Sequence, residues 1–270
     1  MHANMPHPYH STNLVSVPAA LLASPLFNDH PVPLCLNGVR ETNPALFRML
    51  ADADSPEESM EAFHNYMGTL FGLDGMGQPQ RHGVRRFRSS YLRLLRGWAF
   101  DSNNAEAAVL KGWVESRFGL PPLYHKAPLD ARYADAGMAY LEEKMSSRFH
   151  NNSINAQLDL RYEYGQYMLR RFRLLPYPRL TLWRGANEFV EERVIEGSLG
   201  SGDCIIRLNN LVSFTFSRER ADEFGAWILE AEVPAVKVLF FNGLFTEPLL
   251  QGEGEAIVIG GDYRVRARYV

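Results

Sequence analysis

One stretch of seven residues decides the fold of the C-terminal third of the chain: Leu211-Val212-Ser213-Phe214-Thr215-Phe216-Ser217. Hydroxyl and phenyl side chains alternate strictly along it, which is the two-residue period of a β-strand. The alternation places the three hydroxyls on one face and the two rings on the other. We therefore predict a strand over residues 205–216 whose aromatic face packs on the core and whose hydroxyl face lines a cleft.

Residues on both sides extend this pattern into a β-rich region. Strands are predicted over residues 180–184, 227–233, 236–240, 255–259 and 263–270, and a short helix at 218–224 tucks Ala221 and Phe224 inward. The strands follow one another without long helices between them, which argues against a doubly wound parallel sheet. The glycines of residues 72–77 and 197–202 also lack the spacing of the dinucleotide-binding fingerprint. If this chain binds NAD, it does so without a Rossmann fold.

Upstream of Pro176 the apolar residues follow helical spacing instead. Ser55 and Pro56, followed by two glutamates, form a typical helix start. Helices are predicted over residues 43–50, from 55 onward, and over 85–98, 104–118, 131–149 and 154–174. The first ten residues are expected to be flexible, and the proline-rich residues 12–38 to form an extended arm. The chain is thus predicted to be α+β, with a mainly helical region at residues 1–175 and a β-rich region at 176–270, either as separate parts or as one compact unit.

The composition is that of an ordinary globular protein. The 270 residues carry a net charge of -3, so nothing indicates binding to nucleic acid. Cys35 and Cys204 form no CxxC pair, and we expect both to be buried, unpaired side chains. Prolines interrupt the apolar residues 15–27, no run approaches the ~20 residues of a membrane span, and the N-terminus lacks a secretory pattern. We therefore expect a cytoplasmic protein without membrane insertion.

Three short motifs are candidates for a functional site. In the first, Arg184 ends an apolar strand and Gly185 follows, which suits an anion such as a pyrophosphate but also an ordinary surface arginine before a turn. The second is the hydroxyl-bearing strand. In the third, Glu253 and Glu255 alternate with Gly252 and Gly254 before an apolar strand. Like charges so close tend to raise one pKa, so the pair needs either a task or full solvation.

The order of these motifs resembles the arginine–serine–glutamate class of mono-ADP-ribosyltransferases, over residues 178–270, and the Glu-x-Glu form resembles its arginine-modifying branch. The resemblance implies a split β-sandwich that carries an NAD+ cleft, with NAD+ as co-substrate and no metal. Arg184 would hold the NAD phosphates, the Gly185 backbone would bind the nicotinamide amide, and Ser213 and Thr215 would line the site. Glu255 would accept a hydrogen bond from the ribose 2′-OH. The usual Ser-Thr-Ser motif fits either at Ser213–Thr215 or at Thr215–Ser217, so the hydroxyl that contacts NAD+ stays open. We expect Ser213 to be the equivalent of the first serine, which would contact that ribose and help to position Glu255.

Three further segments, residues 37–44, 110–120 and 182–189, extend the resemblance to most of the chain and to the ADP-ribosyltransferases that act on dinitrogenase reductase. The resemblance implies that this reductase is the protein substrate, that the modification inactivates nitrogenase in response to ammonium or energy limitation, and that a PII-type signalling protein is the regulator. Residues 1–175 would serve substrate recognition and regulation. Within them, arginines between residues 81 and 98 form either a docking surface or a merely solvated face. They are Arg81, Arg85, Arg86, Arg88, Arg93 and Arg96.

The two glutamates have separable chemical tasks. Breaking the bond between C1′ and nicotinamide develops an oxocarbenium-like cation, which an acceptor such as Glu255 stabilises. A guanidinium has no lone pair to spare, so Glu253 is expected to orient the target arginine and to take its proton. The segment 243–251 is the expected target-recognition loop.

Two alternatives remain at this point: an NAD glycohydrolase, with water as acceptor, or a non-catalytic binding module. An arginine of another protein is a further possible target.

Overall fold

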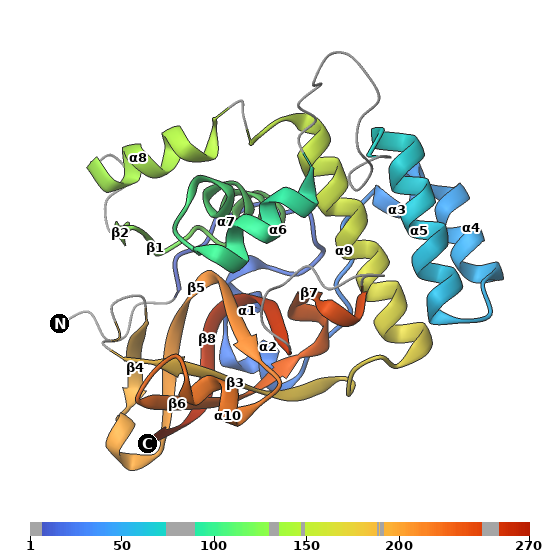
Figure 1. Ribbon diagram of the computed structural model, residues 1–270. Coiled ribbons are helices and arrows are strands. Elements are labelled where there is room, and N and C mark those ends of the chain that lie inside the picture. Colours follow the sequence, from blue (N-terminus) through green and yellow to red (C-terminus); the bar gives the residue numbers. More distant parts are fainter. Residues whose placement is uncertain are drawn as a thin grey trace.

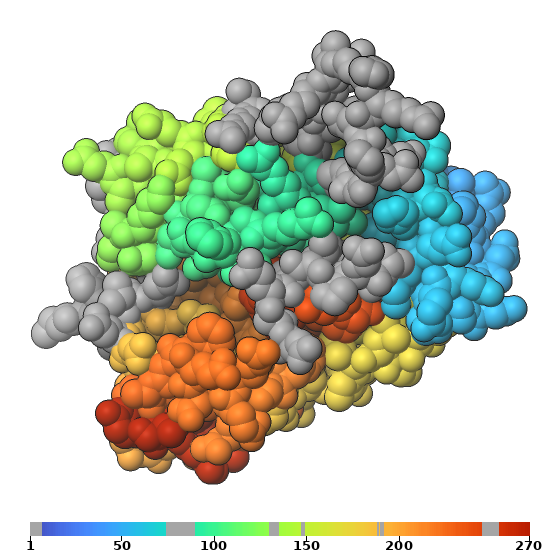
Figure 2. Space-filling model, viewed as in Figure 1, coloured from blue at the N-terminus to red at the C-terminus, as the bar shows by residue number. Residues whose placement is uncertain are grey.

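The computed structural model describes residues 7–73, 90–129, 135–146, 149–187, 189, 192–244 and 254–270. The larger helices precede the strands of the main sheet along the chain, as the α+β prediction requires, and Figure 1 shows these strands at one side of the molecule and the larger helices at the other. In the space-filling view the α4–α5 pair (Pro44–Asp52 and Pro56–Phe71), blue to cyan, forms the end of the molecule away from the orange and red strands (Figure 2).

Two helices of the helical region start at capping residues, of which Ser55 was predicted as a cap from the sequence. Ser55 accepts a hydrogen bond from the Glu58 amide at the start of α5, and Asn104 accepts one from Ala107 at the start of α7 (Ala105–Phe118). Gly119 ends α7 with φ 74°, the left-handed conformation that favours glycine. The remaining larger helices are α6 (Tyr91–Phe100), α8 (Asp135–Lys144) and α9 (Asn152–Phe172). The described part of α8 is shorter than the predicted 131–149, and residues 85–89 of another predicted helix lie outside the described residues.

The N-terminal arm is more ordered than its composition indicates. It contains two short helices, α1 (Ala19–Leu22) and α2 (Pro25–Asp29), an antiparallel bridge joins Val15 to Leu36, and α3 (Val39–Thr42) follows directly after it. His7 is buried, with its ring Nε2 3.3 Å from the Leu208 carbonyl. The prediction of flexibility for residues 7–10 was therefore wrong, because long-range contacts rather than local periodicity hold them. The arm packs on the body as predicted, but two helices interrupt its extended course.

The β-rich region forms a six-stranded antiparallel sheet in the order β4-β5-β3-β6-β8-β7, with an additional pairing between β5 and β8. Its strands are β3 (Arg179–Ala186), β4 (Arg193–Gly197), β5 (Asp203–Thr215), β6 (Trp227–Pro234), β7 (Val238–Phe241) and β8 (Glu255–Tyr269). A two-residue pair, β1 (Tyr124–His125) and β2 (Ala127–Pro128), lies apart from it. The β5–β8 pairing closes four strands into a ring, β5-β3-β6-β8.

Two features of the sheet differ from the prediction. β4 was not predicted, and the segments 255–259 and 263–270 are one continuous strand, β8. Gly260 and Gly261 interrupt the apolar pattern of β8, which made it look like two strands. A Cβ at Gly260 would lie 1.6 Å from the Asn209 carbonyl oxygen, so this glycine allows β5 and β8 to approach each other within one ladder.

A bulge in β5 connects the sheet to the helical region. The register of β5 against β8 shifts between Leu208 and Leu211, which frees Asn209 and Asn210 to reach the helical region. Both are buried, and their amide groups bond to backbone groups within α7 and in the segment from its end to β1. These contacts are Asn209 Nδ2 to the Tyr124 carbonyl, the Leu123 amide to Asn209 Oδ1, and Asn210 Nδ2 to the Lys111 and Leu120 carbonyls, at 2.8–2.9 Å.

The hydrophobic core likewise includes side chains of both regions in one cluster, with α7 packed on β5 and α9 on β7. Cys204 is buried as predicted, whereas Cys35 is exposed, so the expectation for Cys35 was wrong. In the part of the chain that the structure describes, no helix is both long and apolar enough to cross a membrane.

Candidate active site

A cavity of about 530 Å³ lies beside the strands that carry the three motifs. It brings together one or more predicted site residues from each motif. Strands β3, β5 and β8 contribute Arg184, Gly185, Ser213, Thr215 and Glu255 to its lining. The helical region contributes the end of α6 and the turn after it, residues 98–102, and α10 (Arg218–Asp222) closes another side. The volume is within the range of ~300–1,000 Å³ that is typical of small-molecule sites.

Glu255, Ser213 and Trp98 form a chain of hydrogen bonds in this cavity. The Ser213 hydroxyl donates to Glu255 Oε1 over 2.7 Å, and the indole Nε1 of Trp98 donates to Ser213 Oγ over 2.9 Å. Burial raises the pKa of Glu255, and the hydrogen bond from Ser213 acts in the opposite direction. Desolvation of this carboxylate is thus the largest cause of the raised pKa among the described residues, and the like charge of Glu253 lies outside them.

Arg184 is held by a carboxylate and a backbone carbonyl. Its Nε and Nη2 donate to Glu192 Oε1 over 2.9 and 2.8 Å, and its Nη1 donates to the Ser213 carbonyl over 3.0 Å. The Glu192 side chain is buried, so the ion pair is largely shielded from water. These contacts fix the plane of the guanidinium beside the Ser213–Glu255 pair. Arg184 therefore lines the cavity and is not an ordinary surface arginine before a turn, which was the alternative that the sequence left open.

The three hydroxyls of the predicted strand have different surroundings. β5 ends at Thr215, so Ser217 does not belong to the strand face. Ser217 instead caps α10, where its Oγ accepts from the Arg220 amide and donates to Glu219. Thr215 Oγ1 accepts from the Ser217 amide. Ser213 is thus the hydroxyl of the three that bonds to Glu255, which favours the register that places the first serine of the motif at Ser213.

Gly185 sits against the backbone of α10 and the turn after it. A Cβ at this position would lie 2.1 Å from the Ala221 carbonyl oxygen and 2.9 Å from the Gly225 amide nitrogen. Gly185 therefore allows β3 to pack closely against α10. This packing role was not predicted from the sequence, where only the approach of a ligand was considered. Ala221 is buried as predicted, but Phe224 is 66% exposed at the rim of the cavity, so the prediction that it tucks inward was wrong.

Replacing Gly185 with Ala is therefore expected to destabilise the fold. The forced separation of β3 from α10 should lower the free energy of unfolding by roughly 1–3 kcal/mol, which is the usual cost of overpacking. Urea denaturation followed by circular dichroism measures it. Gly200→Ala is the matched control, because a Cβ there meets no atom within 4 Å. Equal unfolding midpoints for the two variants would contradict the packing argument.

Several predicted site residues lie outside the described residues. These are Glu253 with Gly252, most of the loop 243–251, and Arg81, Arg85, Arg86 and Arg88. Gly254 is described and has φ 81°, which agrees with the predicted turn before Glu255. Arg93 and Arg96 lie on α6, and Arg93 pairs with Glu106 and packs over the Phe149 ring. Arg93 thus takes part in packing among helices, a task that the cluster pattern did not reveal.

Two residues that bond to predicted site residues, Trp98 and Glu192, were not predicted from the sequence. Trp98 was assigned to an apolar helix stripe, and it is indeed buried, but no periodicity shows that its N–H reaches Ser213. Glu192 lies eight residues after Arg184 in a run of charged residues, where nothing distinguishes it from a solvated carboxylate. Only a search for a carboxylate partner of Arg184 among the residues that follow it would have found Glu192.

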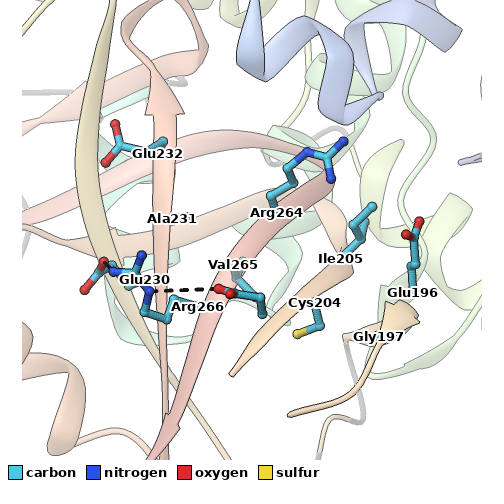
Figure 3. Close-up of a pocket in the computed structure, with 11 residues that line it drawn as sticks. Glu196, Gly197, Cys204, Ile205, Glu230, Ala231, Glu232, Arg264, Val265 and Arg266 are labelled. Atoms are coloured by element: carbon cyan, nitrogen blue, oxygen red, sulfur yellow. Dashed lines mark hydrogen bonds and ion pairs between the residues drawn. The ribbon is translucent and has the colours of Figure 1, made fainter. Parts of the chain in front are cut away.

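A second cavity, of about 410 Å³, lies at the other end of β5 and β8 and is lined by charges of both signs (Figure 3). Arg266 bridges two of its carboxylates, with Nη1 2.9 Å from Glu230 Oε1 and Nε 3.9 Å from Asp203 Oδ1. None of the predicted site residues lines it. Within the described residues, no group of three or more His, Cys, Asp or Glu side chains is arranged to hold a metal ion, and His7 and His10 bond to protein groups.

Comparison with known proteins covers nearly the whole chain. A family model described as Dinitrogenase reductase ADP-ribosyltransferase (DRAT) matches residues 12–267. The chain is 52% identical over 265 residues to the NAD(+)–dinitrogen-reductase ADP-D-ribosyltransferase of Rhodospirillum rubrum, a match that covers 97% of this chain and 96% of that protein. No solved structure matches it. The matched residues include the helical region as well as the strands of the cavity, and the chain belongs to the dinitrogenase reductase ADP-ribosyltransferase family.

Proposed function

We propose that this protein transfers ADP-ribose from NAD+ to a specific arginine of dinitrogenase reductase and so inactivates nitrogenase. The observation that carries the proposal is the cavity in which Arg184, Ser213 and Glu255 meet, since it places a fixed cation and a buried carboxylate in one site of suitable size. Family membership, with 52% identity to a protein that carries this name, supports the choice of co-substrate and target.

NAD+ fits the charge distribution of the cavity. Three of the five N–H donors of Arg184 bond to Glu192 and the Ser213 carbonyl in the described part of the chain, and we assign the others to the NAD pyrophosphate. The Gly185 backbone would bind the nicotinamide amide, and Thr215 would line the ribose pocket. Glu255, oriented by Ser213, would accept a hydrogen bond from the ribose 2′-OH.

The proposed reaction is a substitution at C1′ of that ribose. The bond from C1′ to the nicotinamide nitrogen breaks, and its electron pair leaves with nicotinamide. A guanidinium nitrogen of the target arginine forms the new bond to C1′ and gives up its proton to Glu253. The negative charge of Glu255 stabilises the positive charge that develops at C1′, which favours the transition state over the ground state.

The remaining parts of the proposal concern the rest of the chain. The ring of strands would correspond to the split β-sandwich of ADP-ribosyltransferases. Residues 1–175 would recognise the target and mediate regulation through a PII-type signalling protein, in response to ammonium or energy limitation, in the cytoplasm. The segment 243–251 would contact the target protein beside Glu253.

Incubation of the purified protein with labelled NAD+ and dinitrogenase reductase tests this function. We expect label on the reductase, located by mass spectrometry at an arginine, with release of one nicotinamide per ADP-ribose. Arg184→Ala is the matched inactive variant, provided that its circular dichroism spectrum is unchanged. Label that appears equally with Arg184→Ala, or NAD+ cleavage without any transfer by the native protein, would refute the proposal.

The raised pKa of Glu255 predicts the acid limit of activity. Glu255 must be ionised to stabilise the developing cation, and burial raises its pKa, so kcat/KM for NAD+ should fall with decreasing pH at a higher pH than the ordinary glutamate pKa of ~4.3 would give. Ser213→Ala removes the hydrogen bond that lowers this pKa and should move the limit further upward. An acid limit at or below ~4.3 in a still-folded protein would contradict the assignment.

A further inference from the structure

We propose that Trp98, on α6 of the helical region, is a positioning residue for the reaction: it directs the Ser213 hydroxyl proton toward Glu255. The inference rests on the proposed function, since Glu255 is the group that it serves. It extends that function by making the helical region part of the NAD+ site itself, in addition to any task in recognition or regulation.

The chemistry of the three groups fixes the direction of the hydrogen bonds. An indole N–H donates and never accepts, and a serine hydroxyl has one proton to donate. Because Trp98 Nε1 lies 2.9 Å from Ser213 Oγ, that oxygen is the acceptor in this contact. The single Ser213 proton is then directed to Glu255 Oε1, 2.7 Å away. This arrangement stabilises the ionised form of Glu255, which is the form that the proposed reaction needs.

Packing within the helical region holds the indole in place. Trp98 is 3% exposed, and the Lys111 ammonium lies 5.9 Å from the centroid of its ring. α6 and α7 approach closely at Gly97, where a Cβ would lie 2.6 Å from Glu106 Cβ, and Asn104 Nδ2 donates to the Gly97 carbonyl over 2.7 Å. Packing between α6 and α7 therefore helps to set the position of the N–H.

The chain offers a matched control in the next helix. Trp113 on α7 is also buried, at 1% exposed, and its Nε1 donates to Asp159 Oδ1 over 2.7 Å. It does not line the cavity. Trp113→Phe thus removes an indole N–H and its hydrogen bond from the same helical region without touching Ser213, and it accounts for the structural cost of such a change.

The experiment compares Trp98→Phe and Trp113→Phe in nicotinamide release from NAD+, with kcat, KM and the pH profile measured for each. We expect Trp98→Phe to lower kcat by about threefold to tenfold, as the loss of one hydrogen bond would, with little change in KM. Its acid limit should move to higher pH, whereas Trp113→Phe should keep the native profile. In a Ser213→Ala background, Trp98→Phe should cause no further loss, because the residue through which it acts is gone.

Other results overturn the inference. A native pH profile for Trp98→Phe, or a full additional loss in the Ser213→Ala background, would show that Trp98 does not act through Ser213. Should Trp98→Phe fail to fold, 3-benzothienylalanine at position 98 keeps the indole shape with sulfur in place of N–H, and the same outcomes apply. Failure of the native protein to transfer ADP-ribose would refute the proposed function, whereas a native enzyme with an unaffected Trp98 variant refutes this inference alone.

Discussion

Glu255→Gln is expected to lower the rate of NAD+ cleavage by about 10²–10³-fold, both with and without dinitrogenase reductase. The amide keeps the size of the side chain and an oxygen that can accept from Ser213, so the fold and the hydrogen bond are preserved. It lacks the negative charge that stabilises the developing cation at C1′, and every route that breaks this bond needs that charge. Release of labelled nicotinamide, followed in both conditions, measures the effect.

Glu219→Gln is the matched control for this variant. Glu219 also accepts a hydrogen bond from a serine hydroxyl, that of Ser217 over 2.9 Å, but it does not line the cavity. Its substitution should leave NAD+ cleavage within about twofold of the native rate, as is usual for a surface change. If Glu255→Gln kept a comparable rate, Glu255 would not be the group that stabilises the transition state.

Glu253→Gln is expected to separate the two half-reactions. Transfer to arginine should fall by about 10²–10⁴-fold, because the amide cannot take the proton of the guanidinium. Hydrolysis of NAD+ in the absence of target should persist, because Glu255 and Ser213 are intact. The two measurements are the label on dinitrogenase reductase and the nicotinamide released without it. Glu253 lies outside the described residues, so this prediction depends on its spacing from Glu255 in the sequence.

The comparison between the two rates distinguishes the possible roles of this glutamate. If transfer and hydrolysis fell by the same factor, Glu253 would act on NAD+ rather than on the acceptor, and the assignment of separate tasks would be wrong. If the native protein hydrolysed NAD+ at the same rate with and without its target and transferred nothing, the chain would be an NAD glycohydrolase.

The parts of the site that lie on strands could be predicted from the sequence. Alternation around Ser213 located the hydroxyl face, and the order of Arg184, Ser213 and Glu255 indicated a shared cavity, which the structure contains. Such predictions work because the two-residue period of a strand ties each position to a face. The contribution of Trp98 was not predictable in this way, since it depends on how two helices pack against the sheet.

The errors in the fold prediction have a similar origin. Two adjacent glycines, Gly260 and Gly261, made β8 look like two strands, although Gly260 permits its close pairing with the bulge in β5 and Gly261 permits its approach to Ala23. His7 is held by a contact with Leu208, 201 positions away in the chain, and His10 by contacts with Glu115 and Gly119. Local patterns report neighbours within a few residues, and contacts of this range do not appear in them.

Because of the bulge at Asn209 and Asn210, we expect the β-rich region not to fold without the helical region. Their amides complete the backbone hydrogen bonding of Lys111, Leu120 and Tyr124, so a fragment that begins at residue 176 would expose both asparagines together with the apolar surface of β5. Grafting the strands alone onto another scaffold would lose the same partners. Screens for inhibitors or for altered target specificity should therefore express the entire chain, because the strands of the cavity lack these partners on their own.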